Sequence, residues 1–81
     1  MRFTYDPRHN VAYIRLREKG EELESVRVSD ELTVDIAPDG TIYGIELLNA
    51  NEQFRRGDAG TLLVINEATG ERAELPLAIG S

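Results

Sequence analysis

The most informative stretch of this chain is residues 33–48, T-V-D-I-A-P-D-G-T-I-Y-G-I-E-L-L. Two runs of β-forming residues flank Pro38, Asp39 and Gly40, and each of these three favours a tight turn. Proline fixes φ, aspartate offers a local acceptor and glycine adopts a left-handed backbone. Because apolar and polar residues alternate from 32 to 36, the stretch predicts a β-hairpin whose first strand has one apolar face.

The second strand of this hairpin departs from a simple alternation. Tyr43, Ile45 and Leu47 are expected on one face, but Ile42 and Leu48 fall on the other. An antiparallel sheet with one solvated face shows a clean alternation of apolar and polar residues. We therefore expect the rest of the chain, or a second chain, to cover part of the second face.

The same period of two predicts strands on the N-terminal side of the hairpin. The expected elements are a strand with Phe3 and Tyr5 on one face, a turn at 6–10 in which Asn10 tolerates positive φ, a strand at 11–16, a charged loop at 17–21 turning at Gly20, and a strand at 23–28. Because charged residues interrupt the last of these, it is expected at a sheet edge, where charges discourage association of sheets.

A short helix and a second hairpin are expected on the C-terminal side. Asn49 and Glu52 are spaced as a capping pair and Gly57 suits a helix end, so we expect about two turns of helix at 50–56. Residues 62–65 are apolar on both faces, and Pro76 suits a sheet edge or strand end. The predicted fold class is mostly β (α+β): a single domain over residues 1–81, with an antiparallel meander of five strands, the helix and a C-terminal hairpin at 61–77.

The composition limits the classes of function. The chain has 15 acidic and 9 basic residues, a net charge of −6, which disfavours direct binding to nucleic acid or to an anionic membrane. It has no cysteine, so neither a disulfide nor a thiolate metal site can stabilise it. No apolar segment has the length of a signal sequence or a membrane span. We expect a cytoplasmic, soluble protein and, because so small a domain is marginally stable, a homodimer.

Five short motifs together resemble a known family. They are Y-D-P at 5–7, A-Y-I-R-L at 12–16, V-D at 34–35, D-G at 39–40 and G-I-E-L-L-N-A at 44–50. In order and spacing they are similar to a family of small bacterial and archaeal proteins classified as a domain of unknown function, with the pattern Y-D-x-x-x-D-A-L-Y-I followed by G-I-E-I-L-D-A. The resemblance covers residues 2–52 and leaves the hairpin at 61–77 as an addition. It implies an accessory or antitoxin-like role, since members are often encoded near toxin-like or other short genes.

No pattern in the chain identifies catalytic machinery, and we do not expect an enzyme. His9 is the only histidine and stands in a predicted turn, where a solvated side chain is expected rather than a general base. Val11 and Asn49 stand where the family carries acidic residues, which removes two candidate carboxylates. The alternative hypothesis is a small-molecule-binding protein or enzyme whose site lies at the first turn and contains Tyr5, Asp6, Arg8 and His9.

Metal ions and cofactors are not expected either. The densest acidic set lacks the spacing of a calcium loop and is interpreted as a solvated face; it comprises Glu21, Glu22, Glu24, Asp30 and Glu31. The arginines are too dispersed along the sequence to predict a phosphate clamp, and no glycine-rich phosphate loop precedes a helix. The sequence therefore gives no catalytic, cofactor-binding or metal-binding residue.

Tyrosines supply the best functional lead. Tyrosine combines a large apolar body with a polar tip and is enriched where protein surfaces meet a partner. The predicted interaction surface consists of Tyr13, Tyr43, Ile42, Leu48, Leu62 and Val64. The leading hypothesis is a non-catalytic protein-interaction module that forms a homodimer, with a basic protein as the partner that best suits its negative charge.

Overall fold

The computed structural model describes residues 1–18, 22–55 and 60–77. The chain forms two compact units, Met1–Ala50 and Asn51–Ser81. The predicted loop turn at Gly20 and the predicted helix end at Gly57 lie outside the described residues.

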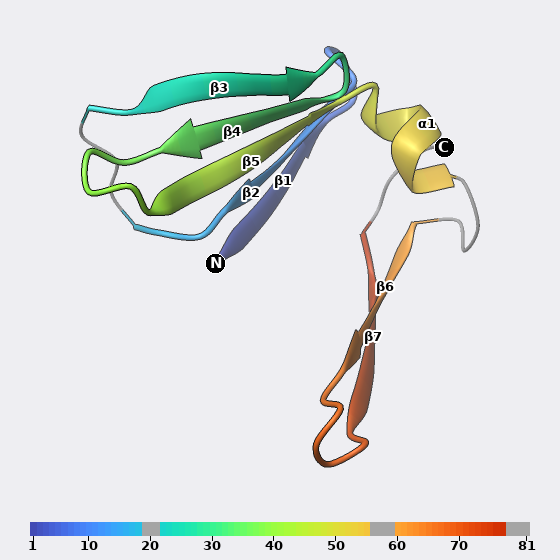
Figure 1. Cartoon of the computed structure of the whole chain (residues 1–81). Coiled ribbons are helices and arrows are strands. Elements are labelled where there is room, and N and C mark those ends of the chain that lie inside the picture. Colours follow the sequence, from blue (N-terminus) through green and yellow to red (C-terminus); the bar gives the residue numbers. More distant parts are fainter. Residues whose placement is uncertain (19–21, 56–59, 78–81) are drawn as a thin grey trace. The chain divides into compact units, whose positions relative to one another are not determined.

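The first unit is a five-stranded antiparallel sheet (Figure 1). Its strands are β1 (Arg2–Asp6), β2 (Val11–Arg15), β3 (Glu24–Ser29), β4 (Leu32–Ile36) and β5 (Ile42–Leu48). The mostly β, antiparallel fold class is confirmed, and β3 lies at an edge as its charges predicted. The strand order, β1-β2-β5-β4-β3, differs from that of a sequential meander because β5 lies between β2 and β4. The hairpin of β1 and β2 is thereby joined, through the pairing of β2 with β5, to a three-stranded meander of β3, β4 and β5.

Two turns adopt the predicted backbone geometry. Asn10, after the first turn, has φ 56°, and Gly40, in the hairpin between β4 and β5, has φ 86°. The side chain of Asp39 accepts hydrogen bonds from the amide of Thr41 at 3.0 Å and from its hydroxyl at 2.5 Å. Asparagine and glycine tolerate a left-handed backbone and aspartate closes its own turn, so these residue types account for both reversals of the chain.

A register shift between β4 and β5 changes where Ile42 lies. Asp35 pairs with Gly44 but Ile36 pairs with Ile42, so Tyr43 is an extra residue in β5. Directly paired residues of an antiparallel sheet share a face. Ile42 therefore lies on the face of Ile36, and not on the face opposite to Ile45 and Leu47, as simple alternation predicted.

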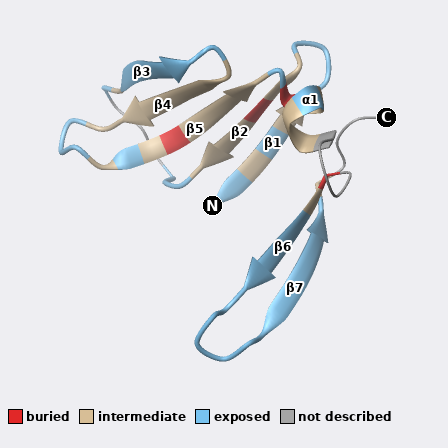
Figure 2. Ribbon diagram, turned by 45° about the vertical axis from the view of Figure 1, so that its right-hand side comes forward, coloured by how far each residue is buried: buried red, intermediate tan, exposed pale blue. Residues whose placement is uncertain are grey.

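The sheet has an apolar and a polar face. Register and alternation place on the apolar face Phe3, Tyr5, Ala12, Ile14, Leu32, Val34, Ile45 and Leu47. In this group Ala12 is buried and the others are half-buried, while β3 is exposed along its whole length (Figure 2). No large side chain among the described residues is fully buried. The apolar face is thus only partly shielded from water.

A short helix, α1 (Ala50–Arg55), follows β5 directly, close to the predicted range. Asn49 has φ 53°, whereas an N-cap residue is extended, so the predicted N-cap geometry is not adopted. The Oδ1 atom of Asn49 accepts a hydrogen bond from Nδ2 of Asn10 at 3.1 Å, and the amide of Ala50 donates to the carbonyl of Asn10 at 3.0 Å. Asn49 therefore ties the end of β5 to the turn between β1 and β2.

The C-terminal hairpin is confirmed. It consists of β6 (Thr61–Ile65) and β7 (Arg72–Pro76), which pair as a two-stranded antiparallel sheet. At the start of the connecting turn, the side-chain oxygen of Asn66 accepts a hydrogen bond from the amide of Ala68 at 3.0 Å. Gly70 ends the turn with φ 79°. Within the described parts of the chain, no helix is long and apolar enough to cross a membrane.

Candidate functional site

A hydrogen-bonded group of three side chains joins three strands on the polar face of the sheet. The hydroxyl of Tyr13, on β2, donates to Oδ2 of Asp35, on β4, at 2.6 Å. Ser25, on the edge strand β3, donates its hydroxyl to Oδ1 of the same carboxylate at 2.6 Å. Ser25 and Asp35 are direct partners in the register, but Tyr13 reaches Asp35 across the intervening strand β5.

Gly44 makes this reach across β5 feasible. It pairs with Arg15 on one side and with Asp35 on the other, so it lies between β2 and Asp35. A Cβ atom built on Gly44 would clash with the phenol oxygen of Tyr13 and with two of its ring carbons, which would lie 2.5 and 2.7 Å away. The ring of Tyr13 therefore occupies the space that any other residue at position 44 would fill. Glycine inside a strand often marks such a close approach.

This arrangement favours the neutral form of Tyr13. Burial, and then the hydrogen bond to Asp35, raise the pKa of Tyr13 well above its ordinary value of 10.0. Both carboxylate oxygens of Asp35 already accept hydrogen bonds. The group is thus suited to holding β2, β4 and β3 together, and it offers no activated nucleophile.

The first turn brings together three of the four residues of the alternative site. Oδ1 of Asp6 accepts the amide of Arg8 at 2.9 Å, and its Oδ2 lies 2.7 Å from Nδ1 of His9. The hydrogen bond from His9 is the main reason that the pKa of Asp6 lies below its ordinary value. Tyr5 precedes Asp6 in β1 and therefore lies on the opposite face of the sheet. His9 thus has an orienting carboxylate, which the sequence did not predict, but its side chain is 72% exposed.

No metal centre is formed by the described residues. Among them there is no group of three histidine, cysteine or acidic side chains placed to hold a metal ion. Of the acidic set singled out in the sequence, Glu21 lies outside the described residues, and Glu24 and Asp30 are exposed at opposite ends of β3. The described part of this acidic set is spread along the edge strand and does not converge on one point.

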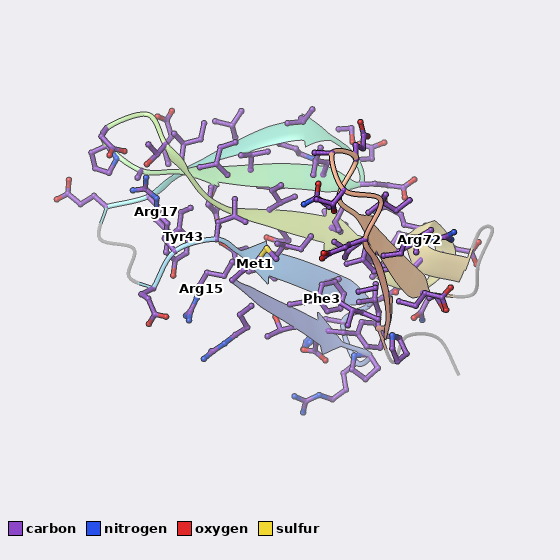
Figure 3. All side chains as sticks on the ribbon, turned by 90° about the horizontal axis from the view of Figure 1, so that it is seen from below. Met1, Phe3, Arg15, Arg17, Tyr43 and Arg72 are labelled. Atoms are coloured by element: carbon purple, nitrogen blue, oxygen red, sulfur yellow. The ribbon has the colours of Figure 1, made fainter. Side chains whose placement is uncertain are left out.

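The predicted interaction residues lie on several surfaces. Tyr13 is occupied with Asp35, and Leu48 pairs with Val11 on the same polar face. Tyr43 and Ile42 lie at the bulge of β5, at the same end of the sheet as Arg15 and Arg17 (Figure 3). Leu62 and Val64 belong to β6, in the second unit, and are 44% and 47% exposed.

Sequence reasoning missed Ser25 and Asp35 as partners of Tyr13. Both residues are polar members of alternating strands, where a solvated side chain is the ordinary interpretation. The signal in the sequence was Gly44. It interrupts a run of β-forming residues and leaves the polar face without a side chain at that position. Only the register of β5 between β2 and β4 shows which ring fills that space.

Comparison with known families assigns the first unit to a protein family. A family model described as "Protein of unknown function (DUF2283)" matches residues 2–51, which is more than half of the 81-residue chain. The chain belongs to the DUF2283 family. The match covers all five strands of the sheet and ends before β6, so the C-terminal hairpin lies outside the DUF2283 region. No curated protein and no solved structure matches the chain.

Proposed function

We propose that this protein is a non-catalytic interaction module that acts as a homodimer through its C-terminal hairpin. Apolar side chains are exposed along both strands of that hairpin, and this exposure supports a partner there (Figure 2). Leu62, Leu63, Val64, Ile65 and Leu75 are each between 38% and 50% exposed. Burying one such side chain fully is worth about 1.5–3 kcal/mol, so a partner that covers them gains substantial free energy.

The register of the hairpin sorts these residues onto two faces. Leu62 pairs with Leu75 and Val64 pairs with Ala73, which makes one face wholly apolar. The other face combines Leu63 with Glu74 and Ile65 with Arg72. A two-stranded hairpin is at best marginally stable in water on its own. The wholly apolar face, with Leu62, Val64, Ala73 and Leu75, is therefore the one that gains most from burial against a partner.

The open edge of β6 favours a second copy of the chain as this partner. Its residues, T-L-L-V-I, include no charge and no proline, whereas β7 carries two charges and ends at Pro76. Charges and proline protect an edge against further pairing, and an uncharged apolar edge lacks that protection. Two copies with a net charge of −6 each repel one another, and β6 is a segment where they can approach without adding to that repulsion. An antiparallel β6–β6 contact is self-complementary, as a twofold dimer requires.

Sedimentation at micromolar concentration tests the dimer. We expect twice the chain mass of 9.0 kDa, and we expect Leu62→Asp to dissociate or unfold the dimer. Ala68→Asp places the same charge in the turn of the same hairpin, and Glu22→Lys changes an exposed charge far along the sequence; both should leave the dimer intact. A persistent mass near 9.0 kDa would mean that the hairpin is covered within its own chain and would refute the homodimer.

We further propose an accessory or antitoxin-like role in which the acidic chain binds a basic protein. The net charge of −6 supports this, because complementary charge speeds encounter and selects the partner. Co-purification from the native host followed by mass spectrometry is the test. A stoichiometric basic protein whose binding weakens with salt is expected, and a bound metabolite in its place would favour the alternative below.

The alternative is a small-molecule site at the first turn. It is favoured by the contact of 2.7 Å between Nδ1 of His9 and Asp6, which orients the ring. Among the described residues no hydrogen-bond partner is found for Nε2, the nitrogen that would act on a ligand. Loss of a bound metabolite in His9→Ala, with the dimer unchanged, would support this site over the interaction module.

A further inference from the structure

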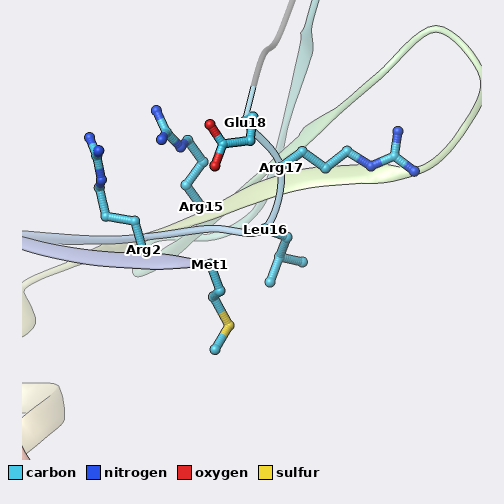
Figure 4. Close-up of a pocket in the computed structure, with 6 residues that line it drawn as sticks. All are labelled: Met1, Arg2, Arg15, Leu16, Arg17 and Glu18. Carbon is cyan, nitrogen blue, oxygen red and sulfur yellow. The ribbon is translucent and has the colours of Figure 1, made fainter.

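Two arginines lie side by side at the open end of the first hairpin. Arg2 on β1 and Arg15 on β2 are direct partners in the register, and such partners share a face of the sheet. Figure 4 shows both guanidinium groups on the same side of the hairpin, and Glu18 lines the same cavity. Met1, Leu16 and Arg17 complete the lining of a cavity of about 170 Å³ around them.

The charges of this pair are not neutralised by the described part of the chain. Arg8, Arg17 and Arg27 each have a carboxylate at 3.6–3.8 Å, supplied by Asp6, Asp39 and Asp30 respectively. For Arg2 and Arg15, residues 1–18, 22–55 and 60–77 provide no such ion pair, not even from Glu18 in the same cavity.

Like charges placed directly opposite one another in adjacent strands destabilise a sheet. The chain has 15 acidic residues against 9 basic ones, so carboxylates for neutralising this pair are not scarce. Within the described residues, two positive charges nevertheless lie together without an ion pair, in a concave region, on a protein that is negative overall. This combination is expected where an anion from outside the chain completes the charge balance.

We propose that Arg2 and Arg15 form a binding site for the dianionic phosphate group of a small molecule. A guanidinium offers parallel N–H donors that match two oxygens of an anion. A carboxylate has two oxygens and can satisfy one such fork, whereas a phosphate group has three or more oxygens and can bridge two. Two guanidinium charges also match the charge of a phosphate dianion. The site differs from the homodimer contact and does not depend on it.

Isothermal titration of the full chain with inorganic phosphate, in a buffer free of other multivalent anions, tests this site. We expect saturable binding, weakened by about tenfold or more in Arg15→Gln and in Arg2→Gln, because each substitution removes a charged hydrogen-bond donor. Arg27→Gln is the matched control, since Arg27 has Asp30 as its partner and lies on β3, and it should bind phosphate as the wild type does.

A second measurement separates loss of the site from loss of the fold. Without phosphate, the melting temperature of Arg15→Gln should equal or exceed that of the wild type, because one like-charge contact is removed. With phosphate, the melting temperature should rise for the wild type and not for this variant. Absence of saturable binding, equal binding by Arg15→Gln, or binding of acetate as tight as that of phosphate would each overturn the proposal.

Discussion

The ring of Tyr13 lies over Gly44 and takes the place of a side chain there. This relationship explains how a residue on β2 can hydrogen-bond to Asp35 on β4 although β5 lies between them. It also explains why a strand otherwise rich in β-forming residues contains a glycine.

Gly44→Ala should destabilise the fold by about 1–3 kcal/mol, because the added methyl group must displace the ring of Tyr13 from a filled space. Chemical denaturation measures this free energy of unfolding. In a Tyr13→Ala background the same substitution should cost much less, since the ring is absent and the two changes are coupled. An equal cost in both backgrounds would show that Gly44 is required for a reason other than the ring.

Tyr13→Phe should cost about 1.5 kcal/mol near neutral pH, as expected for a hydrogen bond to a charged group. The folded chain holds the pKa of Tyr13 above 10.0, its ordinary value, so this contribution is complete below pH 10.0 and is lost as the pH rises beyond it. The difference in stability between wild type and variant should therefore shrink in alkaline solution. If the difference in unfolding free energy between wild type and variant changes by less than about 0.3 kcal/mol from pH 8 to 12, the hydrogen bond is not its source.

His9→Ala should change the free energy of unfolding by less than about 0.5 kcal/mol, because the side chain is 72% exposed. The same substitution should raise the pKa of Asp6 toward its ordinary value of 3.8, since the hydrogen bond from His9 is the main cause of its lowering. NMR titration of the Asp6 carboxyl carbon follows this change. Because the pKa is lowered in the folded state, Asp6 contributes stability above pH 3.8 that is lost as the pH falls through the folded value. That acid-dependent loss should be smaller in His9→Ala.

Gly40→Val should cost roughly 1–2 kcal/mol, because φ is 86° and a branched residue is strained in the left-handed region. No atom lies within 4 Å of a Cβ built at this position, so the cost comes from the backbone alone. Gly40→Asn should cost less, as asparagine tolerates this region better. Thermal unfolding of the two variants gives the comparison, and equal losses would argue against backbone strain.

Local patterns predicted much of the fold. The turn at Asn10, the turn at Gly40, the edge position of β3 and the C-terminal hairpin each depend on a few neighbouring residues, and all four are confirmed. The position of Ile42 was not predictable in this way. One extra residue at Tyr43 shifts the pairing of β5 with β4, and the sequence of β5 alone does not show it.

The candidate sites depend on pairing between distant segments. Tyr13 and Asp35 are 22 residues apart, and Asn10 and Asn49 are 39 apart, so sequence spacing does not link them. The same holds for Arg2 and Arg15, which are dispersed in the sequence but opposed in the sheet.

The class of fold, its turns and its acidic charge are predictable from the sequence, because they follow from residue type and from periodicity along a few neighbouring positions. The position of β5 between β2 and β4, and hence the set of side chains that meet on the polar face, follows from the pairing of distant strands. Strand order arises from hydrogen bonding and burial summed over several distant segments. No single strand carries that information in its own sequence.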